Sequence, residues 1–600
     1  MTPDNHAAVS ELLAEFHRDP GMVLQILRRL QLARNFISDS DVDIVAESLN
    51  LPRTKIRALI DFYSFLHSSP RGHYDIYFSD SITDHMLGSR ESARVFCKEL
   101  GVEPGVPDKG GLVTVAFTSC TGLCERGPAV LVNGIAIDRV NPARAREMAK
   151  LIKAETPLLE WPLEWFVIND MIRRKGPLLS MSVARGAAVH RAIELGSDGI
   201  IEELKAAGLR GCGGGGFPTW RKWDICRSAG AVERYVICNA DEGEPGTFKD
   251  RALLNCEGCN VIEGMTVCGL AIGASKGVIY LRHEYEFLRP RLEKRLHRRR
   301  ETGLLGRNIA GHHGINFDIE IIMGAGSYVC GEESALIESL EGKRGIPRVR
   351  PPFPVTQGYM GCPTVVNNVE TFAYAAGIVA EGPNYFHENE IHPGYKLVSI
   401  SGDCRLPGIY ELPIGTTVDE ALEACGAEDV QAIQVGGPGG TLLAASEGDR
   451  ELSFDDTNTG GSFIVLDKSR DLLDVALNFT KFFAHESCGF CTPCRVGTKL
   501  MLNMANKIAD GHGARLDIEQ MRRLNRLMTQ ASHCGLGQSA AVPILTTYEK
   551  FPEAFQRRME DVEYKPAFDV DAWVYWGVLG VFILVPFFAT YIAQWRKDSL

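Results

Sequence analysis

The spacing of apolar residues changes character near residue 70. Before that point, apolar residues recur every three or four positions, as in Leu12–Phe16 and Ile56–Phe62, which is the period of an α-helix. After it, short runs of β-branched and aromatic residues alternate with helical stretches. The predicted strands are Tyr74–Phe78, Leu112–Phe117 and Ala129–Gly134, and the predicted helices are Ser89–Leu100 and Pro142–Ala154. We therefore expect a helical bundle at residues 1–70 and an α/β unit at 71–154.

A polar, proline-containing stretch at 155–177 is predicted to be a linker, and a run of glycines stands out in the chain behind it. The residues of this segment that could contact a ligand are Gly211, Gly213, Gly214, Gly215, Gly216, Phe217 and Lys222. Bare backbone N–H groups in such a run can close around a phosphate or a flat ring, and a lysine adds a positive charge. A flexible linker is the alternative, but linkers are Gly/Ser-rich over longer spans and lack adjacent bulky aromatic residues. The run therefore indicates a nucleotide-binding loop.

Further segments between residues 178 and 394 place polar side chains after predicted strands or ahead of predicted helices. Open α/β folds usually bind their ligands at such strand ends. Amide side chains both donate and accept hydrogen bonds, which suits the ring edges of a flavin. The candidate residues are Asn239, Asp241, Glu244, Tyr328, Gly331, Glu332, Glu333, Arg350, Phe353, Asn367 and Asn368.

The last third of the chain predicts a short β-rich unit at 395–447 and a helical domain at 448–560 that carries a cysteine motif. Cys488, Cys491 and Cys494 are separated by two residues each, and Cys534 follows after two predicted helices. Three cysteines at this spacing fit three corners of a cubane, and a fourth completes its ligands. Zinc sites more often use two separated pairs. The motif therefore predicts a [4Fe–4S] cluster.

Composition narrows the class of protein. The 600 residues are too many for one core and indicate several domains. A net charge of −12 and a pI near 5.8 argue against a nucleic-acid partner. Seventeen cysteines without a visible signal peptide indicate reduced thiols and metal ligands rather than disulfides.

The segments at 209–223, 238–251, 323–343 and 351–371 resemble the flavoprotein subunit of respiratory complex I and its relatives. Those relatives are the diaphorase subunits of NAD-reducing [NiFe] hydrogenases and of NAD-dependent formate dehydrogenases. The resemblance covers about residues 10–560, and the fusion of its parts in one chain most resembles the hydrogenase subunit. It implies a multidomain α/β and α+β protein, in which 71–154 is thioredoxin-like, 178–394 is a complex I-type FMN-binding domain, and 395–447 is a β-grasp module.

The same resemblance implies roles for the candidate residues. FMN would be held by the glycine loop together with Lys222, Asn239, Asp241, Tyr328, Gly331, Glu332, Asn367 and Asn368. NAD(H) would meet Phe217, Glu244, Glu333, Arg350 and Phe353. Hydride transfer requires no general acid or base, so we expect Glu332 and Glu333 to position ring and ribose and to set the local field. Cys212 stands where the family usually has Arg, and Arg350 where Lys is usual.

The resemblance also raises the question of whether the thioredoxin-like unit holds a [2Fe–2S] cluster. That family uses two cysteine pairs, whereas this chain has Cys120 and Cys124 together with Ser79 and Asp84 where the first pair is expected. Oxygen ligands are poor partners for cluster iron. We therefore expect a domain that serves docking rather than one that holds a cluster at Cys120 and Cys124.

The C-terminal stretch Ala572–Ala593 has 22 residues without a charge. A helix of that length spans roughly the 30 Å hydrocarbon core of a bilayer, and aromatic residues lie at both ends of the stretch. The sequence therefore predicts a single-pass transmembrane helix at 572–593, with the large domains on the cytoplasmic face of the inner membrane.

Three functional interpretations follow. The first is a subunit that passes hydride from NADH to FMN and then single electrons through [4Fe–4S] to partner subunits of a membrane-associated complex, which would include further iron–sulfur, catalytic or membrane subunits. The second is the same module running as an NAD⁺-reducing diaphorase of a hydrogenase or formate dehydrogenase. The third, of another class, is a non-catalytic scaffold that keeps only the cluster.

Overall fold

The computed structural model describes residues 3–180, 183–387 and 394–559. Within these ranges no helix combines the length and the apolar character that crossing a bilayer requires. The predicted transmembrane helix at 572–593 lies outside the described residues.

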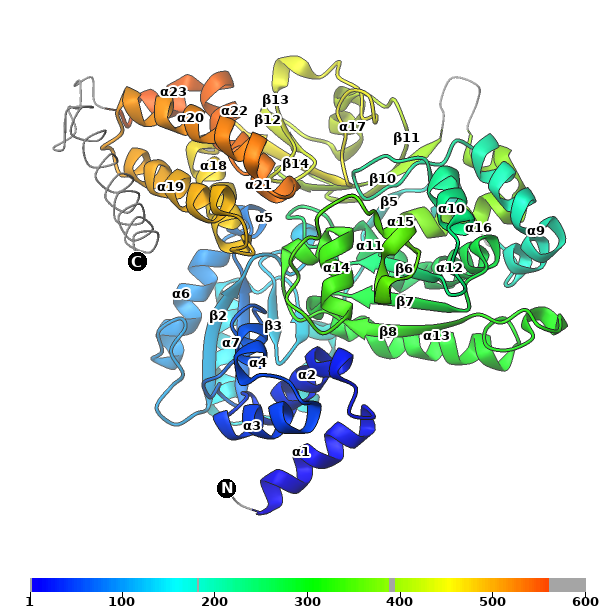
Figure 1. Ribbon diagram of the computed structural model, residues 1–600. Coiled ribbons are helices and arrows are strands. Elements are labelled where there is room, and N and C mark those ends of the chain that lie inside the picture. Colours follow the sequence, from blue (N-terminus) through cyan, green and yellow to red (C-terminus); the bar gives the residue numbers. More distant parts are fainter. Residues whose placement is uncertain (1–2, 181–182, 388–393, 560–600) are drawn as a thin grey trace, which may run out of the picture.

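A small helical bundle opens the chain and packs against the central domain (Figure 1). Its apolar residues share one hydrophobic cluster with Ile237, Val278 and Leu336 of the central domain. Polar contacts fix the same junction, since the Tyr63 hydroxyl donates to the carbonyl of Lys343 at 2.8 Å. The helices are α1 (Pro3–Glu15), α2 (Val23–Arg34), α3 (Asp39–Leu49) and α4 (Arg53–Ile60).

The α/β unit that follows has the predicted thioredoxin-like organisation. Its sheet runs in the order β2-β1-β3-β4, with β1 parallel to β2 and antiparallel to β3. The hairpin β3–β4 turns at Asn133 and Gly134, both of which have positive φ. The elements are β1 (Tyr74–Ser79), α5 (Ile82–Met86), α6 (Ser89–Leu100), β2 (Val113–Thr118), the 3₁₀ turn η2 (Cys124–Arg126), β3 (Val130–Val132), β4 (Ile135–Ile137) and α7 (Pro142–Lys153).

The central domain is built on a parallel four-stranded sheet in the order β8-β7-β6-β9. The chain moves outward from β6 through β7 to β8 and then returns to the other side of β6 as β9. Ligands of open α/β sheets bind at such a switch point, beyond the carboxyl ends of the strands. The strands are β6 (Tyr235–Ala240), β7 (Lys276–Leu281), β8 (Asp318–Met323) and β9 (Thr364–Asn368).

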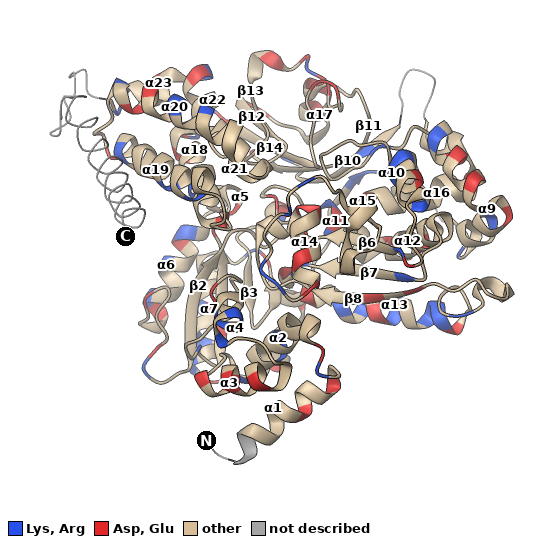
Figure 2. Ribbon diagram, in the orientation of Figure 1, with Lys and Arg blue, Asp and Glu red and all other residues tan. Residues whose placement is uncertain are grey.

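Helices cover both faces of this sheet. The helices α9, α12 and α16 pack together on one face, while α14 and the N-terminal bundle cover the other. The basic helix α13 runs beside the edge strand β8 (Figure 2). The helices are α8 (Pro177–Ser180), α9 (Ala187–Ala206), α10 (Thr219–Ser228), α11 (Lys249–Cys256), α12 (Gly258–Ile272), α13 (Arg289–Glu301), α14 (Glu333–Leu340), α15 (Pro354–Gln357) and α16 (Val369–Glu381).

The β-rich module is a six-stranded sheet in the order β13-β12-β14-β10-β11-β5. It extends beyond the predicted 395–447, because β14 lies at its centre and β5, within the expected linker, forms one edge. The elements are β5 (Ile172–Arg174), β10 (Tyr395–Gly402), β11 (Gly408–Pro413), α17 (Val418–Cys425), β12 (Val430–Val435), β13 (Thr441–Ala444) and β14 (Ser462–Asp467).

The C-terminal described domain is helical. Its core joins apolar residues of α18, α19, α20 and α22, and includes the buried Cys494 and Cys534. The helices are α18 (Leu472–Glu486), α19 (Thr492–Ala509), α20 (Arg515–Ala531), α21 (Gly535–Ser539), α22 (Val542–Lys550) and α23 (Pro552–Gln556).

An ion pair buried between two domains allows their packing to be tested by mutation. Arg251 of the central domain donates to Glu125 of the thioredoxin-like unit at 2.6 Å, and neither side chain is exposed. Glu125→Gln should leave the buried guanidinium without its counter-charge and destabilise the protein by about 3–5 kcal/mol. A clear fall in the thermal unfolding midpoint would show this. Glu91→Gln, which breaks the exposed pair with Arg94, is the matched control; equal midpoints for the two variants would contradict the prediction.

Candidate functional site

A cavity of about 360 Å³ lies at the switch point of the central sheet. Three domains supply its walls. The central domain contributes the glycine loop and the segments that follow β6 and β8, the β-rich module contributes Gly436, Gly460 and Ser462, and the helical domain contributes the segment from Cys534 to Ser539.

Nine of the predicted ligand-binding residues line this cavity, although they come from four separate stretches of the sequence. A predicted cluster ligand, Cys534, lines it as well. The nine residues are Gly213, Gly214, Asn239, Asp241, Glu244, Tyr328, Gly331, Glu332 and Asn368.

Several buried polar atoms of the cavity wall have no hydrogen-bond partner among the described residues. They are Oδ2 of Asp241, Oε1 of Glu244 and Oγ1 of Thr247. A buried polar atom without a partner costs about 1–3 kcal/mol, so three in one cavity indicate a ligand rich in donors. The ribityl chain of a flavin has this character, and the residues present therefore fit an FMN.

Burial also shifts two acids of the cavity wall, Glu244 and Asp241, toward their neutral forms. It raises the pKa of Glu244 to about 7, although the Tyr328 hydroxyl, which donates to Glu244 Oε2 at 2.6 Å, opposes the shift. Burial likewise raises the pKa of Asp241 well above its usual range. Near neutral pH Glu244 therefore lies close to its titration midpoint and can accept or donate a hydrogen bond to a ligand.

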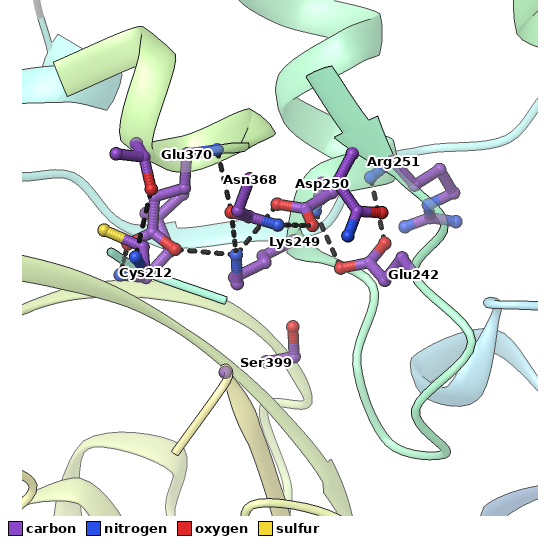
Figure 3. A network of polar contacts seen from close by, with 12 residues as sticks. Cys212, Glu242, Lys249, Asp250, Arg251, Asn368, Glu370 and Ser399 are labelled. Atoms are coloured by element: carbon purple, nitrogen blue, oxygen red, sulfur yellow. Dashed lines mark hydrogen bonds and ion pairs between the residues drawn. The ribbon is translucent and has the colours of Figure 1, made fainter. Parts of the chain in front are cut away.

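A buried lysine organises the base of the cavity (Figure 3). The Lys249 ammonium lies 2.8 Å from Asp250 Oδ1, 2.7 Å from Glu370 Oε2 and 3.1 Å from Asn368 Oδ1. Asn368 in turn donates to Asp250 Oδ2 at 2.6 Å. Burial lowers the pKa of Lys249, but the surrounding carboxylates outweigh that effect and raise it overall. The lysine thus stays charged and holds two cavity-lining side chains, Asp250 and Asn368, in fixed positions.

Of the residues predicted to meet NAD(H), Glu244 lines the cavity, whereas Glu333, Arg350 and Phe353 lie together outside its lining. Arg350 Nη1 lies 3.5 Å from Glu332 and 3.7 Å from Glu333, and its guanidinium approaches the Phe353 ring. Phe217 and Phe353 are large apolar side chains that remain 46% and 50% exposed. Arg350 and Phe353 therefore offer a cation and an open aromatic face next to Glu332, which lines the cavity.

Four other predicted residues face elsewhere. The Lys222 ammonium donates to Glu333 at 2.8 Å and to the carbonyl of Val366 at 2.7 Å, and it does not line the cavity. The Asn367 amide oxygen accepts a bond from the Trp223 indole at 3.0 Å. Within the glycine loop, the Gly216 N–H donates to the carbonyl of Gly211 at 3.2 Å. Their roles toward FMN stay predictions, as does that of Gly215, which is also absent from the lining.

Sequence reasoning missed the contributions of the β-rich module and of Lys249. A signal was present for the module, because Gly436–Gly440 and Gly460–Gly461 are further glycine-rich turns. Lys249, Glu370 and Glu242 carried no such signal, since an isolated charged residue is usually solvated.

The four predicted cluster cysteines come together beside this cavity. Cys494 and Cys534 are buried in the core of the helical domain, and Cys488 and Cys491 pack against the same core. Cys491 and Cys534 occupy the N-cap positions of α19 and α21. No group of described side chains is arranged for a single metal ion, but a cubane holds its thiolates farther apart than one ion does. The donor set fits a [4Fe–4S] cluster.

The donor set of the thioredoxin-like unit does not fit a [2Fe–2S] cluster. Cys120 and Cys124 are buried with their sulfur atoms 3.5 Å apart. The Asp84 carboxylate, however, already accepts from the Ala129 N–H and from the Ser81 hydroxyl, each at 2.8 Å. Among the described residues no second cysteine pair accompanies the first, as Fe–S centres of this kind require.

The position of Glu244 predicts a pH effect on stability. Its folded pKa of about 7 exceeds the ordinary 4.5, so its stabilising contribution is complete below pH 4.5 and is lost as pH rises through 7. Both proteins are compared without flavin. Between about pH 6 and 8 the free energy of unfolding should fall in the wild type by roughly 1 kcal/mol more than in Glu244→Gln, which cannot titrate at this position. Thermal unfolding at both pH values measures the difference. The exposed Glu423 supplies a control, Glu423→Gln; a wild-type pH dependence in Glu244→Gln would refute the assignment.

Four family models match successive parts of the chain. They are described as a thioredoxin-like [2Fe-2S] ferredoxin at 9–153, the Nuo51 FMN-binding domain at 204–376, an SLBB domain at 397–440, and the NADH-ubiquinone oxidoreductase-F iron-sulfur binding region at 474–558.

Individual relatives agree with these matches. The alpha subunit of the NAD-reducing hydrogenase HoxS of Cupriavidus necator is 38% identical over 580 residues, which cover 94% of this chain and 96% of that protein. The HndC component of the NADP-reducing hydrogenase of Solidesulfovibrio fructosivorans is 39% identical over 375 residues, or 60% of this chain and 76% of that protein. A crystal structure of NAD⁺-reducing [NiFe]-hydrogenase in the H₂-reduced state contains a chain with a TM-score of 0.86 and 40% identity, over 92% of this chain and 95% of that one.

These likenesses extend over the cavity, the cysteine motif and the fused thioredoxin-like unit alike. The chain therefore belongs to the family of flavin and iron–sulfur subunits that includes the alpha subunit of NAD-reducing hydrogenase, and it is an NADH:acceptor oxidoreductase (diaphorase) subunit.

Proposed function

We propose that this chain is the NAD⁺-reducing diaphorase module of a multi-subunit hydrogenase-type enzyme. The observation that carries the proposal is the cavity at the switch point, whose unpartnered polar atoms face the same space as Cys534. A flavin bound there would sit directly beside a cluster ligand. The whole-length likeness to the hydrogenase alpha subunit favours this interpretation over a membrane-bound complex. Membrane attachment depends entirely on 572–593 and stays a prediction.

The bound FMN would supply the exchange between a two-electron hydride and single electrons. This chain's residues have simpler tasks. Asn239, Asp241 and Asn368 would hold the flavin through hydrogen bonds, and Lys249 keeps Asn368 in place. The glycine loop lets backbone approach the ligand, because Gly214 has a φ of +109° that a side chain would strain.

The nucleotide would bind at the open side of the cavity. Phe217 and Phe353 offer exposed aromatic faces for stacking, and Arg350 balances the two carboxylates Glu332 and Glu333. Glu333 is also fixed by Lys222, so its carboxylate can accept ribose hydroxyls in a set position. With the flavin bound, the walls from three domains would limit the access of water to the space between them.

The proposal predicts a separation of nucleotide use from flavin retention. Glu333→Ala should raise the KM for NADH about tenfold, as expected for loss of one charged hydrogen bond, while near-stoichiometric FMN is still released on denaturation. NADH-dependent reduction of an artificial acceptor and flavin quantification measure the two effects. The exposed Glu423→Ala is the control for charge removal. A variant that loses FMN at unchanged KM would reverse the roles assigned to Glu333.

A second prediction concerns electron export. Cys491→Ala should abolish the low-temperature EPR signal of the reduced [4Fe–4S] cluster and lower the iron content by about four atoms per chain. NADH should still bleach the flavin, but electrons should no longer reach the partner subunits. Cys362→Ala, which changes a half-buried cysteine outside the set, is the matched control. A persisting cubane signal in Cys491→Ala would remove Cys491 from the ligands.

A further inference from the structure

The cysteine pair of the thioredoxin-like unit lies where its family is described as holding a cluster, yet it lacks the remaining ligands. All seventeen cysteines of the chain fall within the described residues. Only one other cysteine, Cys97, belongs to this unit, and it packs into a different hydrophobic cluster from the pair. A cluster with four thiolates cannot be assembled here from this chain's own cysteines.

The geometry of the pair suits a different chemistry. Cys120 and Cys124 bracket a tight loop in which Gly122 has positive φ and donates its N–H to Cys120 Sγ at 3.4 Å. The two sulfur atoms are 3.5 Å apart. A disulfide requires about 2.05 Å, so a closure of roughly 1.5 Å within one loop would join them.

The surroundings tie this loop to the flavin cavity. Arg282 donates to the carbonyl of Cys120 at 2.8 Å and also to the carbonyl of Glu242, which lines the cavity. The Tyr285 hydroxyl donates to Glu242 Oε2 at 2.7 Å, and the Tyr285 ring fills the space that a side chain at position 122 would need. A change in the loop therefore acts on residues that hold one wall of the cavity.

We propose that Cys120 and Cys124 form a redox-active dithiol that closes reversibly to a disulfide, in place of a [2Fe–2S] cluster. The proposal does not depend on the direction or the partners of the diaphorase. Cys120 and Cys124 have no part in electron transfer between the flavin and the [4Fe–4S] cluster, and the dithiol gives them a separate function.

The oxidant is a low-molecular-weight disulfide of the glutathione class. The Cys120 thiolate, which the Gly122 N–H stabilises, attacks one sulfur of that disulfide and releases one small thiol. The Cys124 thiolate then attacks the Cys120 sulfur of the mixed disulfide and releases the second small thiol. Two electrons pass from the cysteine sulfurs to the small disulfide, and the two thiol protons end on its products. Because both cysteines are only 1% exposed, the exchange requires the loop to open and is slower than at Cys362, which is half-buried.

The test uses the full-length wild-type protein with its partners, equilibrated in glutathione buffers of graded oxidised-to-reduced ratio. Acid quenching, alkylation and peptide mass spectrometry then report the state of each cysteine. We expect the peptide with Cys120 and Cys124 to become two hydrogens lighter and to lose both alkylation sites in a single transition. In Cys124→Ser the small thiol should remain attached to Cys120. Under reducing conditions the iron content of the complex should be the same in wild type and in Cys120→Ser/Cys124→Ser.

Two results would overturn the proposal. One is a pair that keeps both alkylation sites at every buffer ratio, although Cys362 has exchanged. The other is a loss of about two iron atoms from Cys120→Ser/Cys124→Ser together with the loss of a [2Fe–2S] EPR signal that the wild type shows. The wild-type measurement stands even if the variants fail to fold.

Discussion

The buried ammonium of Lys249 is the contact on which the cavity depends most directly. It lies at the start of α11, balances Asp250 and Glu370, and bonds Asn368 at the end of β9. The β-rich module closes over it, because the methylene carbons of Lys249 pack where Gly461 has no side chain. Glu370 also accepts the backbone N–H of Leu397 in β10 at 2.8 Å. One desolvated charge thus couples two domains, since leaving any partner unpaired would cost several kcal/mol.

The cavity needs walls from three domains because a ligand at the ends of the strands is open to solvent on its other sides. The parallel sheet presents strand ends with polar side chains, but it cannot enclose a ligand by itself. The β-rich module adds glycine turns and the helical domain adds the segment after Cys534. The thioredoxin-like unit does not line the cavity. It contacts the central domain through Glu125, which pairs with Arg251, and through the carbonyl of Cys120, which accepts from Arg282.

Long periodic stretches and clustered motifs carry local signals, so the sequence predicted the kinds of domain that the family models match and the segments that the structure brings together at the cavity. Sequence reasoning could not resolve neighbouring residues such as Asn367 and Asn368. Side chains alternate across a strand, so only one of two adjacent amides can face the cavity, and register decides which. It named Lys222, which is next to the glycine run, and did not consider Lys249, whose burial is set by residues far along the chain. The strands β5 and β14 were missed because their partners in the sheet are also distant in sequence.

The connection of the thioredoxin-like unit to the central domain by a short segment has a consequence for assembly. Two separate polypeptides would need to meet at cellular concentrations before Arg251 and Glu125 could be buried together. Tethering replaces that encounter by an intramolecular one, with an effective concentration in the millimolar range for short connections. The stoichiometry of the two parts is then fixed at synthesis, and a contact too weak to hold free subunits together can still persist.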